Sequence, residues 1–247
     1  MVQTRQGLAA MVMLWSSIVA AQPVPPLPPP RPSDVNPPAP TPVPQVERPP
    51  IEAATPPQAE PGTCLTELKA AGFDIEAAEQ PSSSNEGCRI EAPVRLKAVP
   101  VPSRPGTTVR LADQPVLSCR FADRLGHWIG DLVAPLVAGI KETELRAVRT
   151  GPGFECRNRN RATTGKLSAH AEGLAIDIAG FEFANGSIVF IKPEAGAAPD
   201  PALAALRIAA CGWFTTILGP GSDEAHHDHL HVDIEQHGSS DRYRICQ

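Results

Sequence analysis

Residues 167–178 read LSAHAEGLAIDI and indicate a turn followed by a buried strand. Side chains alternate along a strand, so Leu174, Ile176 and Ile178 would share one face. Asp177 would project from the other face, and His170 would precede the strand across a turn that Gly173 permits. A lone aspartate in a strand is most often a hydrogen-bonded structural group. Its role therefore depends on what lies beside it.

The remaining periodicities predict an α+β fold in which an antiparallel sheet, packed with a few helices, carries the site. Asp200 and Pro201 have the residue types of an N-cap and a first helical position, whereas Pro135 should kink or end the longest helix. Prolines around the first two strands indicate that these are edge-like. An Asn-Gly pair at 185–186 predicts a hairpin. The expected helices are 64–78 (with a turn), 118–140 and 200–214, and the expected strands are 88–99, 107–117, 144–151, 173–181, 185–191, 214–219 and 229–234.

A second stretch, DEAHHDHLHVDI at 223–234, holds four of the seven histidines of the chain. Strand alternation places His229, His231 and Asp233 on one face, opposite three apolar residues. Hydrolytic zinc sites use three nitrogen or oxygen ligands and keep one position open for water. His170, Asp177 and one histidine of the pair 229/231 would supply that set. The alternative is a histidine-rich surface that binds metal adventitiously.

The first stretch has the pattern S-x-H-x-x-G-x-A-x-D, from Ser168 to Asp177. This pattern resembles the first zinc motif of D-alanyl-D-alanine carboxypeptidases and of penicillin-insensitive murein endopeptidases. The His-x-His ending resembles the second motif of the murein endopeptidases. The resemblance implies that His170, Asp177 and His231 bind Zn²⁺. It implies that His229 is the general base or stabilises the transition state.

A wider resemblance covers most of the region after residue 61. The segments FECRNRNR, GKLSAHAEGLAIDIAGF, ACGWFTTILGPGSDEAHHDHLHVDI and RYRICQ resemble the bacterial extensin-like C-terminal domain family. That family is related to the zinc peptidases just named, so the resemblance implies a disulfide-stabilised fold like that of the peptidoglycan zinc peptidases. It also indicates that His226, rather than His227, is the family histidine.

Other polar residues are expected near the metal. Arg157 and Arg159 lie where related peptidases place an arginine that binds a carboxylate or steadies an oxyanion, although both could be surface charges beside a disulfide. Asp228 and Asp233 are expected to orient the histidines through hydrogen bonds, with plain solvent exposure as the alternative. The residues expected to support the ligands are His226, Asp228, Asp233 and Ser168.

The first 61 residues differ in composition from the rest. Residues 1–21 have an early arginine, an apolar core and small residues before position 22, which predicts a secretory signal peptide; an uncleaved anchor remains the alternative. Residues 22–61 hold 17 of the 29 prolines, which predicts an extended linker, or alternatively a docking ligand for a partner domain. The folded domain is expected at 62–247, with no membrane span after signal cleavage.

All six cysteines follow the linker, and an even number in an exported chain predicts disulfides. Six cysteines allow fifteen pairings, and the sequence does not choose among them. Pairing by order along the chain, with the last pair holding the C-terminus, would give Cys64–Cys88, Cys119–Cys156 and Cys211–Cys246. There is no C-x-x-C pair, which argues against a cysteine-ligated zinc site.

The net charge of −5 and the absence of a dense basic tract argue against a nucleic-acid partner. The motifs, the signal and the cysteines together predict a periplasmic or secreted zinc peptidase. It would cleave peptidoglycan as a D,D-endopeptidase or carboxypeptidase. Two alternatives remain open, a non-catalytic wall-binding module and a metal-storage protein. The sequence does not specify the bond that is cut or the oligomeric state.

Overall fold

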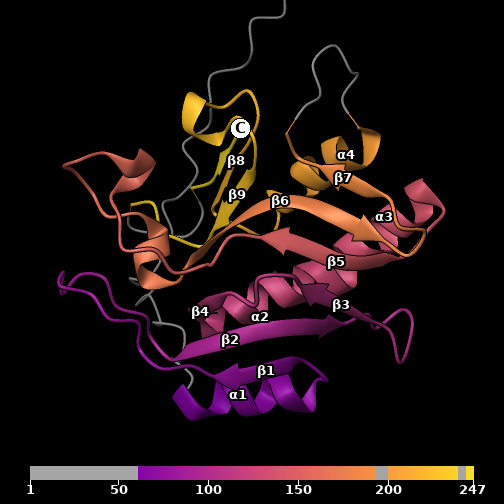
Figure 1. Ribbon diagram of the computed structural model, residues 1–247, viewed down its shortest axis with the longest axis horizontal. Helices are drawn as coiled ribbons and strands as arrows, with labels where there is room; N and C mark the ends of the chain where they lie inside the picture. The colour runs from indigo at the N-terminus through magenta and orange to yellow at the C-terminus, as the bar shows by residue number, and fades with distance from the viewer. Residues whose placement is uncertain (1–60, 193–199, 239–242) are drawn as a thin grey trace, which may run out of the picture. The chain divides into compact units, whose positions relative to one another are not determined.

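Ten strands form one mixed sheet within the part of the chain that the computed structural model describes, residues 61–192, 200–238 and 243–247 (Figure 1). The strand order is β1-β2-β3-β5-β6-β9-β8-β10, with β4 beside β2 and β7 beside β6. The predicted signal peptide and nearly all of the predicted linker lie outside the described residues. The strands are β1 (Asp74–Ala77), β2 (Pro93–Pro100), β3 (Thr108–Leu111), β4 (Val116–Ser118), β5 (Leu145–Thr150), β6 (Ala175–Phe183), β7 (Ile188–Phe190), β8 (Thr216–Leu218), β9 (Leu230–Asp233) and β10 (Ile245–Cys246).

The sheet is mixed, so the expectation of an antiparallel sheet is wrong in two places. β3 pairs with β5 in parallel, and β10 pairs with β8 in parallel. Parallel neighbours need a crossover connection, and the helices between β4 and β5 provide one for the first pair. β2 lies inside the sheet between β1 and the pair β3/β4, so the prediction of an edge strand there is also wrong. Its prolines are tolerated because they occupy the two ends of the strand.

The predicted main helix is a continuous helical segment with a wide turn in its middle. α2 (Cys119–His127) passes through the π-helical turn η1 (Trp128–Val133) into α3 (Ala134–Lys141). Pro135 directly follows the π-helical turn, whose wider hydrogen bonding accommodates it, so it does not end the segment. Trp128 is fully buried and meets the ring of Phe214 edge-on, with 5.2 Å between centroids. This segment packs against β2, β3 and β5 and encloses the main core.

The other helices are α1 (Pro61–Ala70) and α4 (Pro201–Ala210). The Asp200 side chain accepts a hydrogen bond from the Ala202 amide, which confirms the predicted N-cap. The expected helix and turn at 64–78 ends early, because Gly72 takes a positive φ of 90° and the chain continues as β1. Three short 3₁₀ turns complete the fold, η2 (Arg159–Arg161), η3 (Ala169–Glu172) and η4 (Glu224–His226). No described helix is long and apolar enough to cross a membrane.

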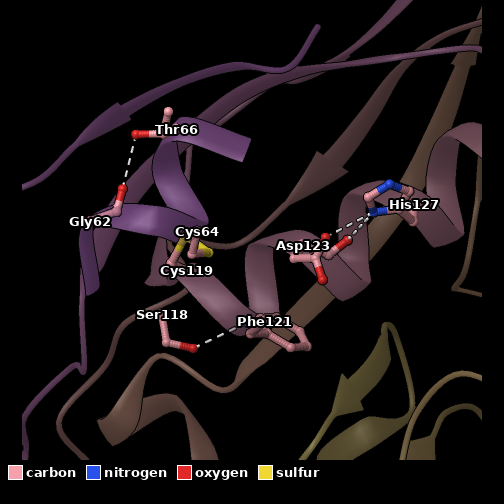
Figure 2. The surroundings of a disulfide bond; sticks show 8 residues. All are labelled: Gly62, Cys64, Thr66, Ser118, Cys119, Phe121, Asp123 and His127. Carbon is pink, nitrogen blue, oxygen red and sulfur yellow. Dashed lines mark hydrogen bonds and ion pairs between the residues drawn. A yellow bond between two sulfur atoms is a disulfide. The ribbon is translucent and has the colours of Figure 1, made fainter. Parts of the chain in front are cut away.

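Three disulfides join Cys64 to Cys119, Cys88 to Cys156 and Cys211 to Cys246. The last pair confirms the prediction, and the other two predicted pairings are wrong. Helix α1 packs against α2, which brings Cys64 to Cys119 at the start of α2 (Figure 2). Cys88 then joins the loop before β2 to the loop after β5. Packing of distant elements, rather than order along the chain, decides these pairings.

Candidate metal centre

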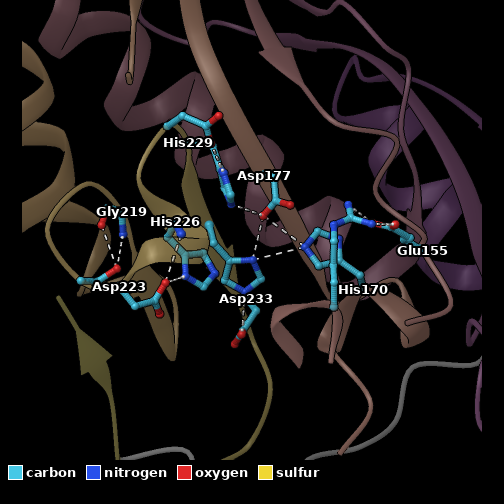
Figure 3. A network of polar contacts seen from close by, with 12 residues as sticks. Glu155, His170, Asp177, Gly219, Asp223, His226, His229 and Asp233 are labelled. Carbon is cyan, nitrogen blue, oxygen red and sulfur yellow. Dashed lines mark hydrogen bonds and ion pairs between the residues drawn. The ribbon is translucent and has the colours of Figure 1, made fainter. Parts of the chain in front are cut away.

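Three predicted ligands converge on one point between β6, β9 and the turn η3. Asp177 of β6 and His231 of β9 are register partners in the antiparallel ladder, so their side chains project from the same face. His170 reaches them from η3. The His170 Nε2 atom lies 3.2 Å from Asp177 Oδ1 and 3.2 Å from His231 Nδ1, and the latter two atoms are 2.9 Å apart. Figure 3 shows the side chains meeting around Asp177.

Two glycines place His170. Gly173 ends η3 with φ 64°, and its amide bonds to the His170 carbonyl. A Cβ at Gly173 would lie 2.8 Å from the backbone nitrogen of Ser118. The carbonyl oxygen of Gly153 accepts a hydrogen bond from His170 Nδ1 at 2.6 Å. This bond orients the ring so that Nε2 points to Asp177.

The hydrogen bonds behind the two histidines fix which nitrogen is free. His170 donates through Nδ1 to a carbonyl, which leaves a lone pair on Nε2 of the neutral ring. His231 donates through Nε2 to Asp233 Oδ2 at 3.1 Å, which leaves a lone pair on Nδ1. Two lone pairs and a carboxylate oxygen therefore face one another.

This arrangement fits a zinc ion. A tetrahedral site with bonds of about 2.0–2.1 Å places its ligand atoms roughly 3.3 Å apart. The three separations found here are 3.2, 3.2 and 2.9 Å. The donor set of two imidazoles and one carboxylate is also one that catalytic zinc uses. His170, Asp177 and His231 could thus hold the metal and leave a fourth position open.

Without metal, a proton holds the cluster together. Burial alone would lower the pKa of His231, but hydrogen bonds to Asp177 and Asp233 outweigh it and raise the pKa to about 9. Burial alone would raise the pKa of Asp177, but hydrogen bonds from His170 and His231 hold it well below its usual range. The imidazolium of His231 between two carboxylates occupies the place that a cation would take.

His229 also faces Asp177, from a different side than His170 (Figure 3). Its Nδ1 bonds to Asp228 Oδ1 at 2.9 Å, and its Nε2 lies 3.4 Å from Asp177 Oδ1. The His229 side chain is 21% exposed, so water or a substrate group can reach it. Asp228 thus orients His229, and Asp233 orients His231.

His226 packs beside these rings, 5.2 Å from the ring of His229 and 5.5 Å from that of His231. Asp223 caps η4 and accepts from both the backbone amide and Nδ1 of His226, the latter at 2.7 Å. Burial lowers the pKa of His226, although the bond to Asp223 opposes this. The exposed His227 bonds to the Glu224 carbonyl, and its Nε2 lies 3.7 Å from Asp228 Oδ2, the carboxylate that holds His229.

The two predicted arginines are placed differently. Arg157 donates to Glu155 and brings Nη2 to 3.6 Å from Asp177 Oδ2, so it borders the ligand cluster. Arg159 instead pairs with Glu235 at 2.8 Å, and among the described residues it has no polar side-chain contact with His170, Asp177 or His231. Ser168 is buried and precedes η3, where its carbonyl accepts from the Ala171 amide. Among the described residues, its hydroxyl forms no hydrogen bond with a ligand.

Of the contributors described so far, Gly153, Glu155 and Asp223 were not identified from the sequence. Gly153 acts through its backbone carbonyl, for which the sequence carries no signal beyond a Pro-Gly turn. Glu155 holds Arg157, and hydrogen bonds from Arg161 and Arg157 lower its pKa against the opposing effect of burial. Asp223 stands three residues before His226, a spacing typical of an N-cap, and this signal could have identified it.

Comparison with known proteins places the chain in a family. Neither curated proteins nor solved structures give a match. A family model described as "Extensin-like protein C-terminus" matches residues 62–247. The match covers the described fold from the second residue of α1 onward, including the three converging residues His170, Asp177 and His231. This chain therefore belongs to the extensin-like protein C-terminus family.

Proposed function

We propose that this protein is an exported zinc-dependent hydrolase that cleaves peptide bonds of bacterial peptidoglycan, as a D,D-endopeptidase or carboxypeptidase. The observation that carries the proposal is the convergence of His170 Nε2, Asp177 Oδ1 and His231 Nδ1 on one point. Apolar packing alone would not gather these groups, because burying polar atoms that face one another is costly without a cation or proton between them.

Zinc held by three protein ligands polarises a scissile carbonyl and lowers the pKa of a water molecule. The protein must then accept and deliver protons. His229 is suited to this role, because Asp228 holds Nδ1–H and leaves Nε2 facing the cluster. We assign His229 as the general base, acting at Nε2. His226, packed against its ring, limits the orientations that His229 can adopt.

Arg157 would bind an anionic group of the substrate. Its guanidinium is held by Glu155 on one side and lies near Asp177 on the other, and its side chain is 16% exposed. A guanidinium fixed in this way can pair with a carboxylate or with the oxyanion that develops on the scissile carbonyl. Stem peptides of peptidoglycan carry free carboxylates. Arg159, bound to Glu235, is not assigned to this step.

The substrate class and the location rest on the motifs and on the cysteines. The two histidine motifs resemble those of enzymes that cut peptidoglycan. All six cysteines are paired, which is typical of an oxidising compartment such as the periplasm or the extracellular space. Peptidoglycan is therefore the proposed partner and Zn²⁺ the proposed cofactor.

The test uses the purified chain with purified sacculi, and the released fragments are identified by mass spectrometry. The wild type should bind one Zn²⁺ and release peptide fragments. H170A and D177A should lose both the metal and the activity, and H229A should keep the metal and lose most activity. H127A is the matched control, because His127 lies at the end of α2, where it pairs with Asp123, and should behave like wild type.

A wall-binding module is the second candidate. One observation favours it: the group beside the ligands that could accept a proton is an imidazole rather than a glutamate. This candidate predicts zinc and sacculus binding without released fragments under any metal or pH. Zinc that remains bound after the double change H170A/D177A would contradict the site itself.

A further inference from the structure

The hydrogen bonds that hold His231 continue through Asp233 to Thr215, the residue directly before β8. Asp233 is 4% exposed, and its Oδ2 faces His231 Nε2 at 3.1 Å. Its Oδ1 has two other partners, the backbone amide of Glu235 at 3.0 Å and the hydroxyl of Thr215 at 3.2 Å. Thr215 is itself buried, at 7% exposure.

The directions of these hydrogen bonds are forced by the groups involved. A backbone amide can only donate, so Oδ1 accepts from Glu235. The Thr215 hydroxyl faces Asp233 Oδ1 and the Asp233 carbonyl oxygen, each at 3.2 Å, and both are acceptors. Thr215 must therefore donate its single proton between them. Two donors hold Oδ1 in place, and Oδ2 is left to accept from His231.

The backbone of Thr215 is also anchored. Its amide donates to the Asp233 carbonyl at 2.9 Å, and its carbonyl accepts from the Ile245 amide of β10 at 2.8 Å. The Cys211–Cys246 disulfide holds β10 at this edge of the sheet. The Thr215 hydroxyl is thus presented to Asp233 from a fixed position rather than from a mobile loop.

We propose that Thr215 is a positioning residue of the metal centre, which acts through Asp233 to hold His231 with Nε2–H turned away and Nδ1 turned toward the ion. The inference rests on the metal centre of the proposed function. Without the Thr215 donor, Oδ1 keeps the Glu235 amide, and the Thr216 hydroxyl still neighbours the carboxylate, so Asp233 is held less firmly rather than released. His231 is then less firmly oriented. Groups that bond a ligand directly, as Asp233 does, typically change metal affinity by roughly 10- to 100-fold, and Thr215, one bond further out, should act at the lower end of that range.

The test measures the Zn²⁺ dissociation constant of the full chain by competition with a chromophoric chelator. T215V removes the hydroxyl and should weaken Zn²⁺ binding roughly 10-fold. T215S keeps the donor and should bind like wild type. T150V is the matched control: Thr150 is 6% exposed and its hydroxyl has no partner among the described residues, so this change should leave the affinity unaltered.

A second readout separates positioning from general stability. The visible spectrum of the Co²⁺-loaded chain should change in T215V and stay unchanged in T150V, because it reports ligand geometry. If T215V does not fold, T215A and T215S replace it, since both lack the methyl group and differ only in the hydroxyl. Equal affinities in T215V and wild type, or equal losses in T215V and T150V, would overturn the inference.

The outcome does not depend on finding a substrate. A chain that binds Zn²⁺ but cleaves no sacculi would overturn the proposed peptidase activity. The Zn²⁺ affinities of wild type and T215V could still be compared. A wild-type chain that binds no Zn²⁺ would overturn both. A wild type that binds Zn²⁺ with T215V unimpaired would overturn the role of Thr215 alone.

Discussion

At the scale of single residues, Asp177 Oδ1 is the centre of the site. It lies 3.2 Å from His170 Nε2, 2.9 Å from His231 Nδ1 and 3.4 Å from His229 Nε2. One carboxylate oxygen thus faces three imidazoles, two of them proposed fellow ligands and one the proposed base. The same oxygen helps to keep a proton on His231 when no metal is bound. Metal and proton therefore compete for the same atoms.

This competition predicts opposite pH dependences. The pKa of His231 is raised from 6.5 to about 9 in the metal-free fold, so the stabilisation is fully present below pH 6.5 and is lost as the pH rises through 9. The free energy of unfolding of the chelator-treated chain, measured with urea, should fall over that window. Zn²⁺ affinity should rise over the same window, because fewer protons must be displaced. A stability that does not change between pH 6.5 and 9 would contradict the assignment.

At the scale of elements, the turn at Gly153 connects two parts of the fold. Its carbonyl orients His170, and its φ of 82° brings it against β4. A Cβ there would lie 2.6 Å from the Val116 carbonyl oxygen and 2.7 Å from a methyl carbon of Leu117. The position needs both a left-handed backbone and a close approach, which only glycine allows.

We therefore expect G153A to destabilise the chain by about 1–3 kcal/mol and to weaken Zn²⁺ binding as well. G106A provides the control, because Gly106 has a similar φ of 84° and no atom within 4 Å of an added Cβ. It should cost about 1 kcal/mol for the backbone alone and leave the metal affinity unchanged. Urea unfolding and chelator competition measure the two effects. Equal losses of metal affinity in both variants would argue against the role of Gly153.

At the scale of the whole molecule, the disulfides join elements that are distant in sequence. Cys88–Cys156 closes 68 positions and ties the loop before β2 to the loop that carries Glu155 and Arg157. Cys64–Cys119 closes 55 positions and holds α1 on α2, among elements that supply no ligand. The two disulfides should contribute similarly to the free energy of unfolding. Only Cys88–Cys156 should also affect the position of the residues around Asp177.

Each pair changed to serine should lower the free energy of unfolding by about 4 kcal/mol. Only C88S/C156S should also reduce activity on sacculi, because it frees the loop that presents Arg157 and the Gly153 carbonyl. C64S/C119S is the matched control, with a loop of comparable length. Peptide mapping of the unreduced wild type by mass spectrometry should find the three pairs described above. Activity lost equally in both double variants would mean that stability alone decides the effect.

Local chemistry made several features predictable from the sequence. Side chains alternate along a strand, so the pattern in residues 173–181 and 229–234 is visible in the sequence. It shows directly that Asp177 and His231 each project from the face of their strand that is opposite the apolar residues. The Asp200 cap and the hairpin at Asn185–Gly186 also depend only on neighbouring residues. The parallel pairing of β3 with β5 could not be predicted in this way, because it depends on how the crossover helices pack.

The sequence by itself determined which residue types lie on which strand face, which put forward Asp177 and the pair His229 and His231. The motif resemblance then singled out His170, Asp177 and His231 as the candidate ligands. Only the tertiary structure decided what holds them: the Gly153 carbonyl behind His170, the Thr215 hydroxyl behind Asp233, and the cysteine pairs. The tertiary structure also placed the two arginines differently: Arg157 lies beside Asp177, whereas Arg159 pairs with Glu235. The physical reason is that strand periodicity acts over a few residues. Hydrogen bonds to a backbone carbonyl and disulfides instead join groups that meet only after the whole chain has packed.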